Sequence, residues 1–186
     1  FLSYLYENSE ESLKIGALVV TLIEFLISIP LFTNFETGFA ALQFVQKVPW
    51  IESLGISYHV GLDSISLFLV LLTKFIMPIT LLGSWRSIHK GMREFLILML
   101  VLQTALIGTF VALDMILFFI FWEAVLIPMY FIVGIWGTER RIYAAIKFFL
   151  YTAFGSALML IAILFLFYLH IEQFGVASMD VEELYR

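Results

Sequence analysis

Long apolar runs occupy most of the chain, and the short stretches between them carry most of its charges. An apolar run of about 18 residues or more is typical of a helix that crosses a membrane. We place five such spans at residues 15–32, 62–85, 95–112, 115–136 and 142–170. Lipid offers no hydrogen-bond partner to free backbone groups, so each span must be helical. The pattern predicts an all-α fold, a polytopic bundle of transmembrane helices.

Two segments lie outside these spans and contain more polar residues. We interpret residues 35–61 as one long loop, in which Trp50 and Tyr58 suit a membrane–water interface. Residues 1–12 are either the end of an earlier span or a tail. The sequence starts with Phe1 rather than Met, and no basic segment precedes a short apolar core. We therefore expect no signal peptide and interpret the chain as a fragment.

Composition narrows the class of protein. Of the 186 residues, 62% are hydrophobic and 13% charged, whereas soluble domains average about 45–50% apolar and about 25% charged residues. A soluble domain of this composition would expose large apolar patches, so soluble, disordered and disulfide-stapled classes are excluded. The net charge of −5 argues against a nucleic-acid partner. The chain has no cysteine and no metal-ligand, phosphate-loop or triad spacing, so we expect no metal or cofactor in it.

The charges outside the spans predict an orientation. If the spans alternate in direction, one side of the membrane is basic and holds Lys14, Arg86, Lys90, Arg93, Arg140 and Arg141. The other side is mostly acidic and holds Glu36, Lys47, Glu52, Asp63, Asp114, Glu172, Asp180, Glu182 and Glu183. The basic side of a membrane protein usually faces the cytoplasm, or the matrix in a mitochondrion. Residues 171–186 are then an outward-facing tail.

Glu123 is the first candidate functional residue, because it lies in the middle of the fourth span. A carboxyl in a low-dielectric medium can gain or lose a proton as a neighbouring charge moves, which is what a proton relay requires. Pro128 follows five residues later and removes one backbone hydrogen bond. The alternative is that Glu123 is held by a structural hydrogen bond.

Lys147 is the second candidate, about 9 Å into the fifth span. It shares a helical face with Ala144, Tyr151 and Gly155. That face is small and polar, and we expect it to look into the bundle rather than at lipid. The alternative is a lysine whose ammonium extends to the nearby headgroups.

Five further residues are candidates from the sequence alone. Glu24 and Lys74 lie at similar depths with opposite charges, and we predict an ion pair between neighbouring helices, because two isolated charges in hydrocarbon cost more than a pair. The alternative is that each faces a water-filled cleft or another subunit. His59 and His89 fall in loops, where a single histidine is usually solvated. His170 ends the fifth span and is expected at the interface.

Three runs of sequence carry a resemblance to a known family. They read GISYHVGLDSISLFLVLLT at 55–73, LDMILFFIFWEAVLIPMYF at 113–131, and AAIKFFLYT at 144–152. These runs resemble subunit M of bacterial NADH-quinone oxidoreductase, which corresponds to subunit 4 of mitochondrial respiratory complex I. The similarity covers the chain from about residue 14 onward, and the Trp-Glu and Lys-Phe-Phe runs are its most specific parts.

The resemblance implies a fold and a role. Members of the family have about fourteen transmembrane helices, which include two inverted repeats. About five of the fourteen helices would be present here. They are antiporter-like proton channels without a redox cofactor of their own, and NAD, FMN, iron–sulfur clusters and quinone are expected in partner subunits. The family's essential glutamate corresponds to Glu123, and the lysine of its next helix corresponds to Lys147. His59 and Asp63 also match, with a structural role expected. Glu24 and Lys74 do not match the pattern.

These expectations divide the chain into four parts. Residues 1–14 are a tail or the end of a truncated first helix, and 15–112 are peripheral helices plus the first helix of the repeat. Residues 113–170 carry the buried glutamate and lysine, and 171–186 are the tail. The glutamate of this family pairs with a lysine on a later helix, which lies beyond residue 186.

The expected function follows from the same resemblance. The chain would be a non-redox subunit of a proton-pumping NADH:quinone oxidoreductase in the bacterial inner membrane or, alternatively, the mitochondrial inner membrane. Its partners would be neighbouring antiporter-like membrane subunits and the lipid bilayer. A multisubunit sodium/proton antiporter, a membrane-bound hydrogenase, and a scaffold segment without ion traffic remain alternatives.

Overall fold

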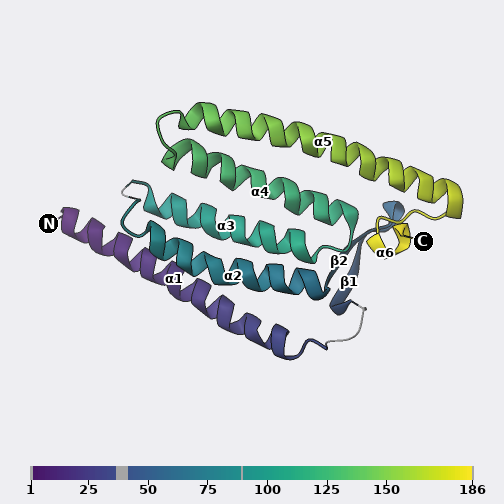
Figure 1. Ribbon diagram of the computed structural model, residues 1–186, viewed down its shortest axis with the longest axis horizontal. Helices are drawn as coiled ribbons and strands as arrows, with labels where there is room; N and C mark the ends of the chain where they lie inside the picture. Colours follow the sequence, from purple (N-terminus) through teal and green to yellow (C-terminus); the bar gives the residue numbers. More distant parts are fainter. Residues whose placement is uncertain (1, 37–41, 89, 186) are drawn as a thin grey trace.

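The computed structural model describes residues 2–36, 42–88 and 90–185, with side chains from residue 10 onward. Over these ranges the chain forms five long helices, a two-stranded hairpin and two short helical turns (Figure 1). The elements are α1 (Leu2–Thr33), β1 (Gln43–Ile51), η1 (Glu52–Leu54), β2 (Ile56–Leu62), α2 (Ser64–Ser84), α3 (Met92–Val111), α4 (Met115–Trp136), α5 (Arg141–Phe174) and α6 (Val181–Leu184). The five predicted spans are therefore confirmed as helices.

All five long helices are long and apolar enough to cross a membrane. The helix α4 coincides with the span expected at 115–136. The helix α1 already begins at Leu2, so the opening residues continue the first span as helix rather than forming a separate tail. The helix α5 extends to Phe174, so His170 lies within it instead of ending it. Length and apolarity fixed the number of helices, whereas their ends depend on caps outside the apolar runs.

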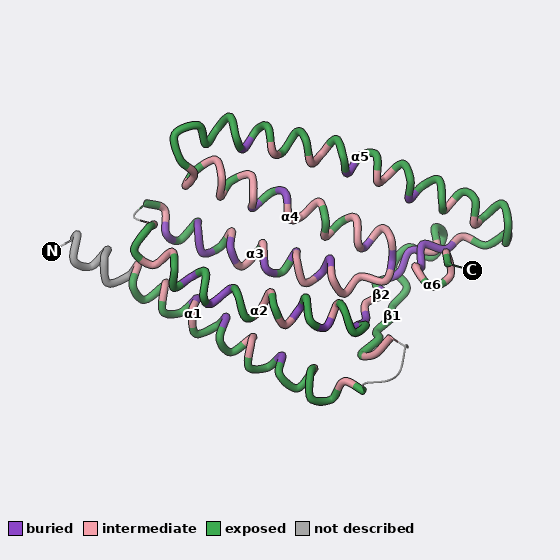
Figure 2. The backbone as a smooth tube through the Cα atoms, viewed as in Figure 1, coloured by how far each residue is buried: buried purple, intermediate pink, exposed green. Residues whose placement is uncertain are grey.

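The five helices lie side by side in chain order, each running opposite to its neighbour (Figure 1). Contacts join each helix to the next, and α1 also touches α3. This arrangement places α5 at the edge of the layer, where it packs against α4 and also contacts the short α6, and most of its surface is exposed (Figure 2). The helices α3 and α4 approach closely at Gly108, which leaves room for the ring of Phe121.

The segment expected to be one long loop is instead mostly a β-hairpin. Strands β1 and β2 pair antiparallel, and Gly55 between them adopts a left-handed conformation, with φ of 62°. The backbone of Ala177 lies so close to Gly55 that a side chain there would collide with it. The all-α prediction is thus right for the membrane helices and incomplete outside them. The long apolar runs gave no indication of a hairpin whose strand β1 is almost entirely exposed.

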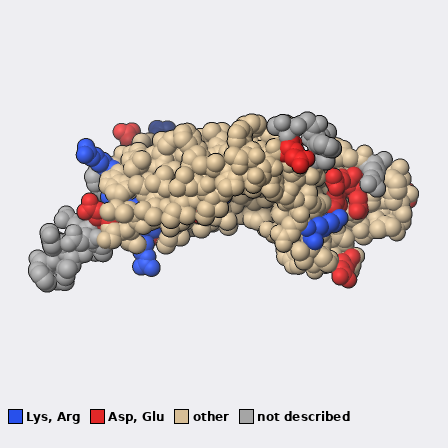
Figure 3. Space-filling model, turned by 90° about the horizontal axis from the view of Figure 1, so that it is seen from below, with Lys and Arg blue, Asp and Glu red and all other residues tan. Residues whose placement is uncertain are grey.

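The charged side chains gather at the two ends of the helices (Figure 3). At the end where α1 begins, basic side chains cover the carboxyl ends of neighbouring helices. Lys14 Nζ donates to the Trp85 carbonyl at 3.1 Å, and Arg141 Nη1 donates to the Ile135 carbonyl at 2.7 Å. Cations stabilise helix carboxyl ends because the last carbonyls carry partial negative charge. The predicted grouping of basic residues is confirmed, and the side that this end faces stays a prediction.

Candidate functional site

Glu123 lies on α4, about 12 Å from the amino-terminal end of that helix. Its side chain is partly buried, and Oε1 is fully buried with no hydrogen-bond partner among the described residues. Buried polar atoms are nearly always paired, so an unpaired carboxylate oxygen indicates a group that is completed by a proton, water or another chain segment. Among the described residues, Oε1 therefore lacks the structural hydrogen bond that the alternative interpretation of Glu123 requires.

Lys147 lies on α5 and is exposed. Its Nζ lies 5.9 Å from the ring centroid of Tyr143, on the same helix. Its neighbours on the expected inward face, Ala144 and Tyr151, are exposed too, and Tyr151 reaches 84%. The helix instead packs through Ala145, which is 1% exposed. The prediction that the Lys147 face looks into the bundle is therefore wrong for these five helices, because α5 is the last of the layer.

The two predicted site residues do not meet in the structure. Counted from the connection between α4 and α5, Glu123 lies about 20 Å along its helix and Lys147 about 9 Å along its own. No ion pair joins them in the described part of the chain. Lys147 is close enough to the basic end for its ammonium to reach the headgroup region. The five helices by themselves thus do not assemble a Glu–Lys pair.

The predicted ion pair between Glu24 and Lys74 is also wrong. Glu24 Oε2 instead accepts a hydrogen bond from Gln103 Nε2 of α3 at 2.8 Å. The structure records no ion pair between Glu24 and Lys74 within its described ranges, and Lys74 is partly buried on α2. Helix α1 touches α3 as well as α2, so a neutral amide of α3, rather than the lysine of α2, meets the carboxyl.

The sequence analysis did not predict a polar cluster that lies at the acidic end of the helices. Asp180 Oδ2 lies 2.6 Å from Lys47 Nζ of β1 and 2.7 Å from His59 Nδ1 of β2, although the His59 contact is poorly aligned for a hydrogen bond. Glu183 Oε1 lies 3.8 Å from Lys47 Nζ. His59 is 3% exposed, so its interpretation as a solvated loop histidine is wrong. The cluster ties the hairpin to the segment after α5.

Hydrogen bonding and charge shift the pKa values in this cluster. The bond to Asp180 raises the pKa of Lys47, although partial burial works against it. Burial alone would raise the pKa of the Asp180 carboxyl, but hydrogen bonds from Lys47 and the Glu182 N–H, together with attraction to His59, lower it below its ordinary value. Both shifts favour the charged forms, so the contact between hairpin and tail is ionic over a wide pH range.

Two aspartates at the acidic end have capping roles that the sequence signals. Asp114 is fully buried and accepts from the backbone N–H groups of Ile116, Leu117 and Ser57 at 2.9–3.1 Å. It therefore joins the hairpin to the start of α4. Asp63 is exposed and caps α2 by accepting from the Ser66 N–H at 2.6 Å, which lowers the pKa of Asp63. An aspartate directly before an apolar run is a common helix-start signal.

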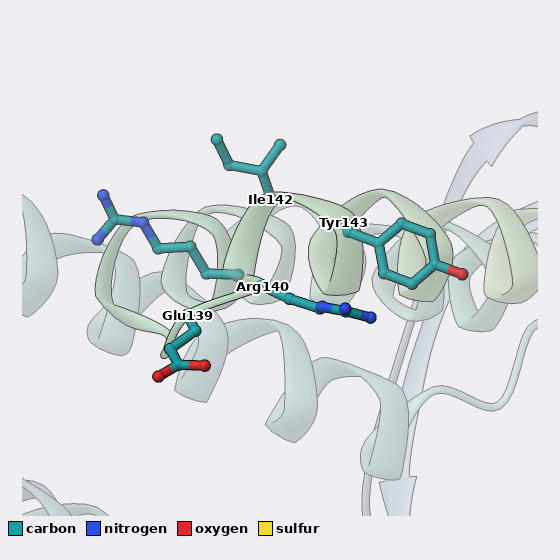
Figure 4. Close-up of a pocket in the computed structure, with 5 residues that line it drawn as sticks. Glu139, Arg140, Ile142 and Tyr143 are labelled. Carbon is teal, nitrogen blue, oxygen red and sulfur yellow. The ribbon is translucent and has the colours of Figure 1, made fainter.

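Two hollows of the described surface lie away from Glu123. A hollow of about 610 Å³ opens at the connection before α5 (Figure 4) and is lined by Glu139, Arg140, Arg141, Ile142 and Tyr143. An apolar groove of about 350 Å³ runs between α4 and α5. Neither is lined by Glu123. No metal-binding group of three or more suitable side chains occurs in the described ranges, and His89 lies outside them.

Comparisons with known proteins agree with this arrangement. The family described as NADH-ubiquinone oxidoreductase chain 4, amino terminus, matches residues 12–109. The family described as NADH:quinone oxidoreductase/Mrp antiporter, TM, matches residues 112–173. The chain is 46% identical to NADH-quinone oxidoreductase subunit M of Rhodobacter capsulatus, over 83% of this chain and 30% of that protein. It is 43% identical to F(420)H(2) dehydrogenase subunit M of Methanosarcina mazei, over 82% and 31%.

A solved structure is also similar. A chain of respiratory complex I from Thermus thermophilus with bound NADH has 28% identity and a TM-score of 0.78, over 92% of this chain and 34% of that chain. The present chain therefore spans about a third of the length of the relatives that it matches.

Proposed function

Because this chain belongs to the NADH-ubiquinone oxidoreductase chain 4 family, we propose that it is part of a proton-conducting membrane-arm subunit of a respiratory oxidoreductase complex. Its five apolar helices and its family make it a multi-pass inner-membrane protein. In this proposal, electron transfer from NADH to quinone takes place in other subunits, which hold the NAD, FMN and iron–sulfur sites. This sequence contains no cysteine that could ligate an iron–sulfur cluster.

The unpaired Oε1 of Glu123 carries the proposal. A carboxyl in the middle of a membrane helix is costly unless it has a partner or a task. The partner is missing from the described part of this chain, so Glu123 can take up a proton, or a hydrogen bond from another segment of the assembly, without first breaking an internal bond. A proton-conducting group needs this freedom, because each transfer step exchanges its bonding partner.

Lys147 is assigned a second role in the same path. Its exposed position on α5 means that its proton partner comes from outside the five helices, whether from another segment or a neighbouring subunit. The ring of Tyr143 keeps the ammonium close to the helix surface by cation–π attraction. Glu123 and Lys147 would then exchange protons through intervening groups rather than by direct contact.

The test is Glu123→Gln in the full-length subunit within its native complex. The amide is nearly the same size but cannot release a proton, so we expect assembly to persist and electron-transfer-driven proton pumping to fall to a small fraction of the wild-type rate. Glu139→Gln, in the exposed loop before α5, is the matched control and should pump normally. Unchanged pumping in the assembled Glu123→Gln complex would favour the scaffold-only alternative and refute the proposal.

A second candidate function rests on the family that matches residues 112–173, whose description includes the Mrp antiporter. A sodium/proton antiporter would move protons only in exchange for sodium. Proton movement that is driven by electron donors in sodium-free medium favours the oxidoreductase role, and an absolute sodium requirement favours the antiporter. A similar protein is a subunit of an F(420)H(2) dehydrogenase. In this proposal, the partner subunits rather than this chain therefore determine which electron donor is used.

A further inference from the structure

Four polar side chains lie at one depth across four helices of the layer. Measured from the helix ends on the hairpin side, Glu24, Lys74, Gln103 and Glu123 all lie about 12–15 Å along α1, α2, α3 and α4. This depth is near the middle of a hydrocarbon core of about 30 Å. The proposed function uses only Glu123 of the four, which leaves a second mid-membrane carboxyl without a role.

Glu24 and Gln103 form a side-chain hydrogen bond within this level. Gln103 is 2% exposed and donates Nε2–H to Glu24 Oε2 at 2.8 Å. Its other amide atom, Oε1, is buried and has no hydrogen-bond partner among the described residues. An ionised carboxylate can only accept hydrogen bonds, so it cannot satisfy this second atom. A protonated carboxyl has one O–H to donate, which is what Gln103 Oε1 lacks.

The charges around Glu24 do not compensate an ionised carboxylate. On its own helix the other charged residues are Glu7, Glu10, Glu11 and Lys14, at least two turns away. On α3 they are Arg93 and Glu94, in its first two residues after Met92, at the far end. On α2 the only charged group is Lys74, which forms no ion pair with Glu24 in the described structure. A lone carboxylate at this depth is costly.

We propose that Glu24 is a second mid-membrane proton-binding site, in which the carboxylic acid and the amide of Gln103 form a two-bond pair. The Glu24 O–H donates to Gln103 Oε1, and the other carboxyl oxygen accepts Nε2–H. Both groups end in a planar fork, and rotation about their broad terminal torsions brings the two forks into one plane. The pair joins α1 to α3 and leaves no buried polar atom of Gln103 unsatisfied. It does not depend on the role of Glu123.

Infrared spectroscopy of the assembled complex in membranes tests this assignment. A protonated carboxyl has a C=O stretching band that is separate from that of a carboxylate and shifts in deuterated water. We expect this band to be lost in Glu24→Gln, whose amide can make the same two bonds and preserve assembly. Glu123→Gln, as the matched control, should retain the Glu24 band. Loss of a carboxylate band instead, or an unchanged spectrum, would overturn the proposal.

A second variant keeps the test decisive if Glu24→Gln does not assemble. Gln103→Met has a similar volume but no hydrogen-bonding amide, so the Glu24 acid band should persist and move to higher frequency as its hydrogen bonds are lost. An unshifted acid band would show that Gln103 does not bond the acid, and the pair would be refuted. Proton pumping is not measured in either experiment, so failure of the role proposed for Glu123 would leave the result for Glu24 unchanged.

Discussion

Replacement of Asp114 by alanine should open the junction between the hairpin and α4. The carboxylate is fully buried and accepts from two N–H groups of the first turn of α4 and from the N–H of Ser57 in β2. The first N–H groups of a helix have no partner within the helix. Asp114→Ala therefore removes the cap of α4 and leaves a buried hairpin N–H without an acceptor.

The expected cost follows from these contacts. Loss of an aspartate cap costs about 0.5–2 kcal/mol. Leaving a buried donor such as the Ser57 N–H unsatisfied costs about 1–3 kcal/mol more. We expect the free energy of opening this junction to fall by about 1.5–5 kcal/mol, which corresponds to amide exchange about 10- to 4,000-fold faster.

Asp63 provides a matched control for this prediction. It caps α2 in the same way but is exposed, and its acceptor contacts are all within four residues. Asp63→Ala should cost about 1 kcal/mol, and its effect should be confined to the start of α2.

Hydrogen–deuterium exchange of the full-length subunit in its complex, read at Ser57 and at the first turns of α2 and α4, compares the two variants. If Ser57 exchanged equally fast in wild type and Asp114→Ala, the buried bond would contribute nothing and the reasoning would be refuted.

Three further predictions concern the hairpin and the helix contacts. Because the pKa of Asp180 is lowered, its bond to Lys47 stabilises the hairpin–tail contact above the ordinary aspartate range, and this stabilisation is lost as pH falls through a value below 3.8. Because the pKa of Lys47 is raised, the contribution of Lys47 is lost only as pH rises above 10.5. Protection of β1 amides, corrected for intrinsic exchange, should fall outside these limits, and protection that stays unchanged well below pH 3.8 would contradict the assignment. Gly108→Ala should force α3 and α4 apart and lower the stability of the complex by about 1–3 kcal/mol, which thermal inactivation would detect. In the control Gly83→Ala, the added methyl group meets no atom within 4 Å, so the change should be neutral or slightly stabilising. Gly55→Ala combines a positive φ with a backbone collision, so it should expose the hairpin to limited proteolysis; an intact hairpin would show that the turn can relax.

The sequence by itself determined the parts of this protein that depend on local chemistry. Backbone groups in lipid must be satisfied within each segment, so five apolar runs sufficed to predict five helices. The same local logic placed Glu123 in the middle of α4 and the basic residues at one end of the bundle. The family resemblance was carried by short contiguous runs, which is why it too could be recognised before the fold was known.

Only the tertiary structure decided which side chains meet. The rotation and neighbours of each helix placed Gln103, rather than Lys74, beside Glu24. The edge position of α5 turned Lys147 away from the other four helices, although its polar face favoured an inward orientation. The bond between Lys47 and Asp180 spans 133 residues and requires the hairpin to fold back on the tail. Such contacts depend on how distant segments pack, which no local pattern of apolar and polar residues specifies.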